Sequence, residues 1–474
     1  GVAAVTAGPG VTNALSALAA ARQNDSPVLF VGGRAPAASW GLGSLQEMDH
    51  LPVVASLCKS AQTIEAAEDA YAMTAAAIRA TLSRRTGPAF LDVPVDVFLQ
   101  AEEPPESTEH LVRDPGSPPD PDAVAQVVGL LLEARRPLLV AGTTVWWAHA
   151  EDELRRLAEA ASIPVVANGM ARGVLAPSHP LFASRARTAA LAGADLVLLV
   201  GAPLDFRLNF GRSPVVAEDA KLVYVDVDGF RQHRAAAASM LGDLRSALSE
   251  LAEAARDVPP RREWLEHVAT EGAAAATRDE TLAAIDSSPV HPARAVAEVE
   301  RWCDRDAIIV GDGGDFVSFA GRLVHRDRPG LWVDGGPFGC LGSGPGYALA
   351  AKLAFPDRQV VLLSGDGAFG FSALEFDTLV RHRVPVVCVV GNNGIWALEK
   401  HPMQRLLGTS LLSDLRPRTR YDLVVEALGG HGEMIDRPEQ IGPALGRAFA
   451  AGVPACVNVI CDPDAEYPRS AVLL

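Results

Sequence analysis

Residues 359–396 read QVVLLSGDGAFGFSALEFDTLVRHRVPVVCVVGNNGIW. The pattern predicts a buried strand ending in Gly365-Asp366-Gly367, a helix-length segment, and a second buried strand ending in Asn392-Asn393. Because parallel strands end at the same edge of a sheet, both polar clusters are expected where open α/β sheets bind ligands. A carboxylate and an amide oxygen there suit Mg²⁺ holding a diphosphate, and free N–H groups of Gly367 and Ala368 at a helix N-terminus favour the same anion. The alternative for each cluster by itself is that Gly-Asp-Gly is an ordinary turn and Asn-Asn an ordinary loop.

The rest of the chain repeats the alternation of short apolar strands and helices, which predicts an α/β fold of three doubly wound parallel-sheet units. We expect these units at 1–102, 123–258 and 291–474, joined by a Pro- and acid-rich linker (103–122) and a helical linker (259–290). The expected strands are 2–6, 28–32 and 89–93 in the first unit, 137–141, 164–167, 196–200 and 222–227 in the second, and 307–310, 360–363, 384–390 and 455–460 in the third.

The overall composition argues against several classes of protein. The chain has 474 residues, with 42 Lys and Arg against 58 Asp and Glu, and a formal net charge of −16. Because it has no Lys/Arg-rich tract, nucleic acid is not expected as a partner. No apolar run reaches the roughly 20 residues of a membrane span. The six cysteines form no C-x-x-C pair, which favours a reducing, cytoplasmic location.

The Gly-Asp-Gly cluster, 24 intervening residues (368–391) and the Asn-Asn pair together resemble the signature of thiamine-diphosphate-dependent enzymes. Within them the chain is most similar to acetolactate synthase large subunits, near the 2-hydroxyacyl-CoA lyases and oxalyl-CoA decarboxylases. Such enzymes have pyrimidine-binding, central and diphosphate-binding domains in that order, as in the three units expected here. The resemblance implies that Asp366, the Asn393 side chain and the Ile395 carbonyl bind Mg²⁺, with Gly367 and Ala368 on the diphosphate.

Two further loops of the third unit resemble cofactor-binding segments of the family. Residues 310–316 match the loop that closes over the diphosphate, so Gly314 and Asp315 are candidates. The Gly-rich run GPFGCLGSG at 336–344 resembles the loop that receives the aminopyrimidine ring. This likeness places the Gly339 carbonyl on the ring amine and Leu341 under the bent cofactor as an apolar wedge. The alternative is a Gly-rich helix entry that packs on the sheet.

In the first unit, residues 6–13 look like the strand-to-helix turn of the pyrimidine-binding domain. Residues 45–49 (LQEMD) resemble the stretch whose glutamine faces the reacting carbonyl, so Gln46 is the candidate for that role. A surface-loop glutamine is the alternative.

The middle unit resembles nucleotide-holding central domains in the segments 184–187 and 200–211. Acetolactate synthases hold FAD there, and the CoA-using relatives hold an ADP-like nucleotide. The likeness does not choose between these two cofactors. Arg187 and Arg207 are candidates to pair with a diphosphate, with ion pairs to neighbouring residues as the alternative.

The family's activating glutamate, which protonates a ring nitrogen of the cofactor, lies upstream of the strand that corresponds to residues 2–6. The resemblance therefore implies that this glutamate is absent from these residues and that the first domain is incomplete. Glu47 and Glu65 match other parts of the pattern and are not candidates. On this interpretation the chain is N-terminally truncated, and its cofactor activation is expected to be impaired.

The implied reaction is decarboxylation of a 2-oxo acid with carbon–carbon bond formation, first of all pyruvate to acetolactate in branched-chain amino acid biosynthesis. The alternatives are carbon–carbon cleavage of an acyl-CoA, as in 2-hydroxyacyl-CoA lyase or oxalyl-CoA decarboxylase, and a catalytically impaired cofactor binder. Residues 394–403 depart from the acidic, Gln- and Met-rich stretch of a typical acetolactate synthase, and Trp396 and Leu398 there could line the pocket or pack in the core. A homodimer or homotetramer is expected by the same resemblance.

Overall fold

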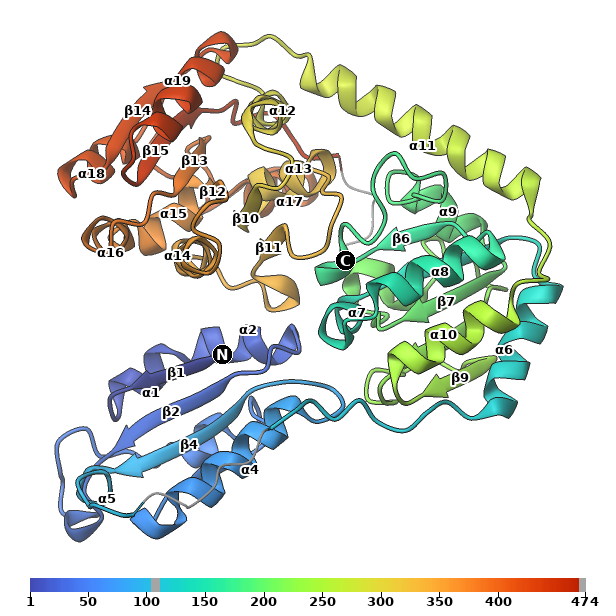
Figure 1. The fold of residues 1–474 in the computed structure, drawn as a ribbon. Coiled ribbons are helices and arrows are strands. Elements are labelled where there is room, and N and C mark those ends of the chain that lie inside the picture. Colours follow the sequence, from blue (N-terminus) through green and yellow to red (C-terminus); the bar gives the residue numbers. More distant parts are fainter. Residues whose placement is uncertain (104–110, 469–474) are drawn as a thin grey trace.

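The computed structural model describes residues 1–103 and 111–468, so part of the predicted 103–122 linker lies outside the described residues. Three sheets, of four, five and six strands, follow one another along the chain, and every strand pair in them is parallel. Helices cover the sheets, and each sheet forms a separate body in Figure 1. The predicted fold class is confirmed, whereas the domain boundaries stay a prediction.

The first sheet has the strand order β1-β2-β4-β3. Phe30 of β2 and Phe90 of β4 belong to one of its two buried clusters, and their ring centroids are 5.5 Å apart. The short edge strand β3 was not expected. The elements of this unit are β1 (Val2–Val5), α1 (Pro9–Asn13), α2 (Leu15–Gln23), β2 (Leu29–Arg34), η1 (Ala37–Ser39), α3 (Leu51–Val54), β3 (Ala61–Thr63), η2 (Ala67–Asp69), α4 (Ala70–Leu82), β4 (Ala89–Pro94) and α5 (Val95–Phe98).

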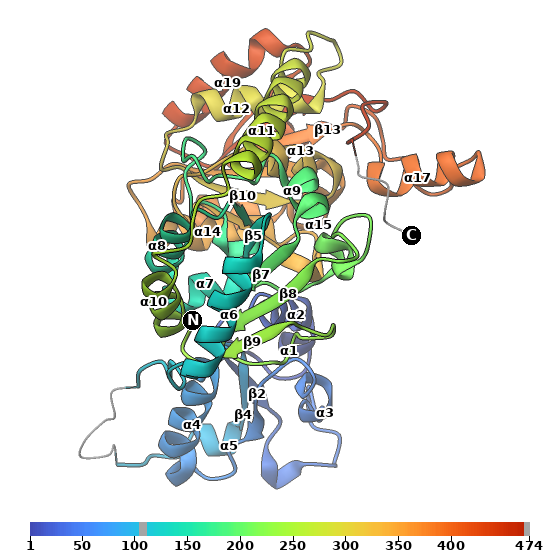
Figure 2. The same ribbon diagram turned by 90° about the vertical axis from the view of Figure 1, so that its right-hand side faces the viewer.

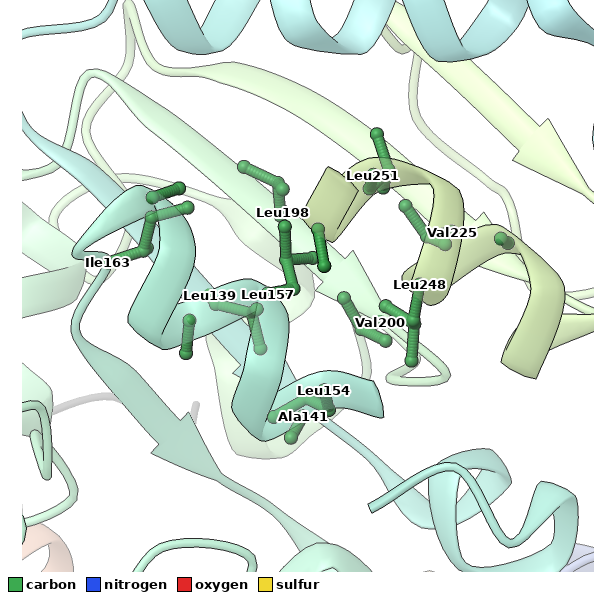
Figure 3. Close-up of a cluster of buried hydrophobic side chains, with 14 of the residues drawn as sticks. Leu139, Ala141, Leu154, Leu157, Ile163, Leu198, Val200, Val225, Leu248 and Leu251 are labelled. Carbon is green, nitrogen blue, oxygen red and sulfur yellow. The ribbon is translucent and has the colours of Figure 1, made fainter. Parts of the chain in front are cut away.

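The middle sheet has the order β6-β5-β7-β8-β9. Its inner strands β5 and β7 are apolar throughout, and β8 is mainly apolar between Lys221 and Asp226, because helices cover both faces, as is usual for all-parallel sheets. Figure 3 shows Leu154 and Leu157 of α8 and Leu248 of α10 gathered over Leu198 and the neighbouring strand residues. The elements are α6 (Pro121–Glu133), β5 (Pro137–Ala141), α7 (Thr143–Ala148), α8 (Glu151–Ala161), β6 (Val165–Ala167), η3 (Gly169–Ala171), α9 (Arg187–Gly193), β7 (Leu196–Val200), η4 (Phe206–Gly211), β8 (Lys221–Asp226), β9 (Ala238–Leu241) and α10 (Leu244–Ala254).

The third sheet has the order β11-β10-β12-β13-β15-β14. Strands β12 and β13 are neighbours, with Gly365 opposite Gly391, so the two polar clusters that follow them lie at one edge. Figure 2 shows α17 extending away from the rest of this unit. The elements are α12 (Pro292–Trp302), β10 (Ile308–Asp312), α13 (Asp315–Leu323), β11 (Trp332–Asp334), η5 (Gly336–Phe338), α14 (Gly344–Ala354), β12 (Val360–Gly365), α15 (Asp366–Ser372), α16 (Glu375–Arg381), β13 (Val387–Asn392), α17 (Ala397–Leu407), α18 (Tyr421–Ala427), β14 (His431–Ile435), α19 (Pro438–Ala450) and β15 (Ala455–Ile460).

A buried ion cluster joins the first unit to the middle unit. Arg85 lies 3.1 Å from Asp25 and 2.9 Å from both Asp226 and Asp228. Arg231 approaches Asp25 to 2.9 Å from the middle unit. Since Arg85 and Asp25 are both buried, each depends on the other for charge compensation. The cluster therefore fixes the first sheet against the middle one.

Arg172 of the middle unit contacts the third unit. It donates hydrogen bonds to the carbonyls of Gly321 (2.7 Å) and Val324 (3.1 Å) and lies 4.3 Å from the ring centroid of Trp332. The long helix α11 (Arg262–Ala283) runs between the same two units in Figure 1. Over the described ranges, no helix is long and apolar enough to cross a membrane.

Candidate active site

Asp366 lies at the carboxyl edge of the third sheet, where β12 passes into α15. Its Oδ1 accepts a hydrogen bond from the Gly367 N–H (2.9 Å) and its Oδ2 from the Gly394 N–H (2.7 Å). The carboxylate therefore ties the end of β12 to the loop after β13. The Gly367 N–H is not free, in contrast to the prediction, because the adjacent carboxylate already accepts from it. Ala368 is buried in the same short helix.

Asp366 is 3% exposed, and no ion pair reaches its carboxylate within the described part of the chain. Burial raises the pKa of Asp366 to about 6, against the opposing effect of the two backbone hydrogen bonds. A bound cation would compensate this buried charge. The described residues contain no cluster of three or more His, Cys, Asp or Glu side chains suited to a metal. One carboxylate with amide and carbonyl oxygens instead suits Mg²⁺, which keeps several waters and uses few carboxylates.

The two asparagines after β13 have different environments. Asn392 is buried, and its Nδ2 donates to the Thr419 carbonyl (2.9 Å) and to Oδ1 of Asn458 (3.0 Å). Asn393 is half-buried at the sheet edge, and among residues 1–103 and 111–468 its Oδ1 accepts a single hydrogen bond, of 3.2 Å, from the Ile395 N–H. Asn392 thus holds the loop to the core, while Asn393 remains available as a ligand beside the Ile395 backbone.

Trp396 and Leu398, which follow this loop, pack on two of the candidate glycines. A Cβ added to Gly367 would lie 2.5 Å from Cζ3 of Trp396, and one added to Gly314 would lie 2.5 Å from Cδ1 of Leu398. Both approaches are closer than carbon atoms tolerate, so a larger residue at either position would have to displace the Trp396 ring or the end of the Leu398 side chain. The two large side chains therefore line the loops that carry Gly314 and Gly367. Asp315, the other candidate there, is buried and begins α13.

Asp312, which the sequence reasoning did not single out, anchors the loop that carries Gly339 and Leu341. Its carboxylate accepts from the N–H groups of Gly342 (3.0 Å) and Gly344 (2.7 Å) at the end of β10. Burial raises the pKa of Asp312, against the opposing effect of those two bonds. The signal that could have identified Asp312 is its position at the end of an apolar strand. Gly339 has a φ of +68° with open space around it, and Leu341 is half-buried beside it.

Gln46 lies in the first unit and has a φ of +60°. Its Oε1 accepts a 3.3 Å hydrogen bond from Oγ1 of Thr6, and its backbone lies against Gly8. These contacts all belong to the first unit. The structure thus brings the Asp366, Asn393 and Leu341 segments together in the third unit and places Gln46 in a different body of the same chain.

The two arginines of the middle unit have protein partners. Arg207 pairs with Asp205 through three side-chain hydrogen bonds of 2.6–3.2 Å. Arg187 donates to the Arg207 carbonyl (2.8 Å), and burial lowers its pKa to about 10. Arg207 is therefore held by a carboxylate, whereas Arg187 is bound through one backbone oxygen.

Comparison with known protein families gives one match in each of the three units. Family models of thiamine pyrophosphate enzymes match the N-terminal TPP-binding domain at residues 1–53, the central domain at 124–251 and the C-terminal TPP-binding domain at 312–459. The acetolactate synthase large subunit IlvG of Mycobacterium tuberculosis is 52% identical over 476 residues, covering 100% of this chain and 86% of the relative. The chain belongs to the thiamine pyrophosphate enzyme family.

Two 2-hydroxyacyl-CoA lyases are more distant relatives of the chain. The 2-hydroxyacyl-CoA lyase 2 of Homo sapiens is 34% identical, covering 97% of this chain and 80% of that protein. Its counterpart in Caenorhabditis elegans is 33% identical, covering 92% of this chain and 75% of that protein. The family's C-terminal model includes Asp312, Asp366 and Asn393, and its N-terminal model includes Gln46. These four polar residues thus fall in the two TPP-binding domains of the family.

Proposed function

We propose that the protein is the catalytic subunit of an acetolactate synthase, which joins two pyruvate molecules into acetolactate with release of one CO₂. The observation that carries this proposal is the 52% identity, along the whole chain, to an acetolactate synthase large subunit. Asp366 is buried at a sheet edge beside Asn393 and has no cationic partner within the described ranges, which supports the use of Mg²⁺ and thiamine diphosphate. The product would enter branched-chain amino acid biosynthesis.

The chain's own residues would hold and orient the reactants. Asp366, the Asn393 side chain and the Ile395 carbonyl would bind Mg²⁺, and the loops at Gly314 and Gly367 would surround the diphosphate. Leu341 would support the cofactor from below, on the loop that Asp312 anchors. When bound, thiamine diphosphate supplies a nucleophilic carbon and an electron sink for the carbonyl chemistry.

Gln46 would orient the reacting carbonyl. Its Oε1 accepts from Thr6, so its amide NH₂ is left to donate to the carbonyl oxygen of a substrate. Donors aimed at an oxygen that gains negative charge stabilise the transition state more than the ground state.

A second subunit would complete this site, and we propose a homodimer or a dimer of dimers. Exposed apolar side chains surround the candidate site on the third unit: Phe338 is 46%, Phe371 68% and Leu374 73% exposed. Such a patch is typical of a surface that another chain covers. We propose that the first unit of the partner subunit, which carries Gln46, covers this patch. We also propose a cytoplasmic location, the domain boundaries given above, and FAD or an ADP-like nucleotide in the middle unit.

A second candidate is cleavage of a 2-hydroxyacyl-CoA to formyl-CoA and an aldehyde. The observation that favours it is the 33–34% identity to 2-hydroxyacyl-CoA lyases over more than nine-tenths of the chain. The departure of residues 394–403 from the typical acetolactate synthase pattern points the same way.

A direct test compares the two reactions in one preparation. The protein expressed from its native reading frame, so that any glutamate encoded upstream of these residues is included, is loaded with thiamine diphosphate and Mg²⁺. It is given either pyruvate or a 2-hydroxyacyl-CoA, and acetolactate and formyl-CoA are quantified. We expect acetolactate from pyruvate, and its loss in Asp366→Ala but not in Asp377→Ala on the exposed face of α16. Formyl-CoA formation with no acetolactate would replace the synthase assignment by the lyase. If the protein binds the cofactor but forms neither product, both catalytic assignments fail and the protein is a cofactor binder.

A further inference from the structure

His50 is a fully buried histidine in the first unit that none of the preceding assignments uses. It is 0% exposed and immediately precedes α3. Its Nε2 lies 3.1 Å from the backbone nitrogen of Gly8, and its Nδ1 lies 3.2 Å from Oδ2 of Asp92. Each of these partners is 42 residues from His50 in the sequence. The ring therefore bridges the strand-to-helix turn after β1 and the buried strand β4.

These partners decide where the ring proton lies. A backbone N–H can only donate, so Nε2 must accept from Gly8 and carries no proton. Nδ1 then carries the proton and donates it to the Asp92 carboxylate. Arg34 compensates that carboxylate from 3.0 Å. Burial raises the pKa of Asp92, but hydrogen bonds from His50, Thr63 and Arg34 outweigh this and keep the pKa below its ordinary value. The arrangement holds a neutral imidazole with its acceptor nitrogen aimed at Gly8.

Gly8 in turn lies directly against Gln46. Gly8 has a φ of +57°, and a Cβ added to it would lie 3.0 Å from the Gln46 carbonyl oxygen and 3.1 Å from the Gln46 Cβ. Thr6, two residues earlier in the same turn, donates to Oε1 of Gln46. The turn 6–8 thus touches both the backbone and the amide of Gln46. Any movement of the turn shifts the direction of that amide.

We propose that His50 is a positioning residue for Gln46: through its hydrogen bond to Gly8 it fixes the turn on which the Gln46 amide rests. The inference rests on the proposed function, in which Gln46 faces the reacting carbonyl. Misplacement of a reacting or orienting group by about 1 Å can cost about 100-fold in rate. A neutral acceptor at the Nε2 position is what the role requires, so a glutamine at position 50 can partly replace the histidine.

The test is a double-mutant cycle on the loaded full-length enzyme with His50→Leu, His50→Gln, Gln46→Ala and the double variant Gln46→Ala/His50→Leu. We expect His50→Leu to lower kcat by about 10- to 100-fold with little change in KM, and His50→Gln to recover much of the loss. In the Gln46→Ala background, His50→Leu should lower kcat little further, because the effect of His50 on kcat passes through Gln46. Equal losses in both backgrounds would overturn the proposal.

The control is His179→Leu, at a histidine with the same two kinds of partner and a side chain that is 21% exposed, against 0% for His50. Its Nδ1 also accepts from a backbone N–H (Leu181, 3.2 Å) and its Nε2 also meets a carboxylate (Glu159, 3.2 Å), but it lies in the middle unit. We expect it to leave kcat unchanged. A loss in kcat equal to that of His50→Leu would show a general effect on folding and overturn the proposal.

Hydrogen exchange of the Gly8 amide gives a readout that needs no turnover. We expect faster exchange of a peptide covering the turn in His50→Leu, and near wild-type exchange in His50→Gln. Unchanged exchange in His50→Leu would overturn the inference even in an active enzyme. If the wild type makes no acetolactate, the proposed function fails separately, and the cycle is then measured on cleavage of a 2-hydroxyacyl-CoA. Inactivity in both reactions would overturn the proposal as well.

Discussion

Replacing Asp366 by asparagine tests whether this edge of the third sheet is built for a cation. Asp366 is 3% exposed, and burial raises the pKa of its carboxyl from 3.8 to about 6. The rise corresponds to about 3 kcal/mol against the ionised form. Because the pKa is higher in the folded state, this cost is complete above about pH 6 and declines as the pH falls toward about 4. Below that pH it is absent.

In protein freed of metal and cofactor, Asp366→Asn removes the buried charge. It also leaves one of two N–H groups, that of Gly367 or Gly394, with a poorer acceptor, at a cost of about 1 kcal/mol. We expect the variant to be more stable than the wild type by about 2 kcal/mol at pH 8, and by less than about 1 kcal/mol at pH 5. Because three units need not unfold together, the assay is denaturant-dependent hydrogen exchange of β12 and β13.

With Mg²⁺ and thiamine diphosphate the order of stability should reverse. A ligand at about 100 times its Kd stabilises the wild type by about 2.7 kcal/mol, whereas the variant lacks the anionic ligand and gains little. Asp377→Asn, on the exposed part of α16, is the matched control and should behave like the wild type. A variant less stable than the wild type at pH 8 without ligands, or stabilised equally by Mg²⁺ and cofactor, would refute this reasoning.

Other predictions concern the domain junction, the glycine contacts and the thiols. Arg85→Met leaves two buried aspartates without their shared cation and should lower the free energy of unfolding by about 3–5 kcal/mol, measured as a lower thermal midpoint. Arg231 is more exposed, so Arg231→Met should lower the midpoint less. Equal decreases would contradict the role of Arg85 at the centre of the cluster. Gly367→Ala should weaken thiamine diphosphate binding, measured by calorimetry. Adding Trp396→Ala should restore binding, because it removes the ring that the new Cβ meets. If binding is not restored, the loss comes from the loop at Gly367 itself. Burial raises the pKa of the Cys456 thiol far above its ordinary range, so an aromatic disulfide reagent at pH 8 should label it only after denaturation. Rapid labelling of the folded protein would disprove its burial.

The interior strands were predictable because their sequences carry the signal of burial. The expected bounds of β5, β7 and β15 coincide with those observed, and all three strands are buried along their whole length inside parallel sheets. Continuous apolar runs are what such strands require. The strands that were not expected, β3, β9, β11 and β14, all lie at sheet edges. They are three to five residues long, and only one side of each is paired, so their sequences carry little of that pattern.

The approach of Asp366 to the loop after β13 was predictable for the same reason, since consecutive strands of a parallel sheet end at one edge. The sequence could not tell that Asn392 would turn inward, because its partners Thr419 and Asn458 come from other segments. The Asp312 contacts depend likewise on the path of a loop 30 residues away. His50 gave no local signal at all, because both its partners lie far from it in the sequence.

The most direct test of the central claim is acetolactate formation from pyruvate by the purified full-length protein with thiamine diphosphate and Mg²⁺, measured beside Asp366→Asn. The account predicts sustained acetolactate and CO₂ release by the wild type, abolished when Mg²⁺ is chelated, and almost none from the variant. Wild-type protein that binds the cofactor yet makes no acetolactate, or a variant as active as the wild type, would contradict it.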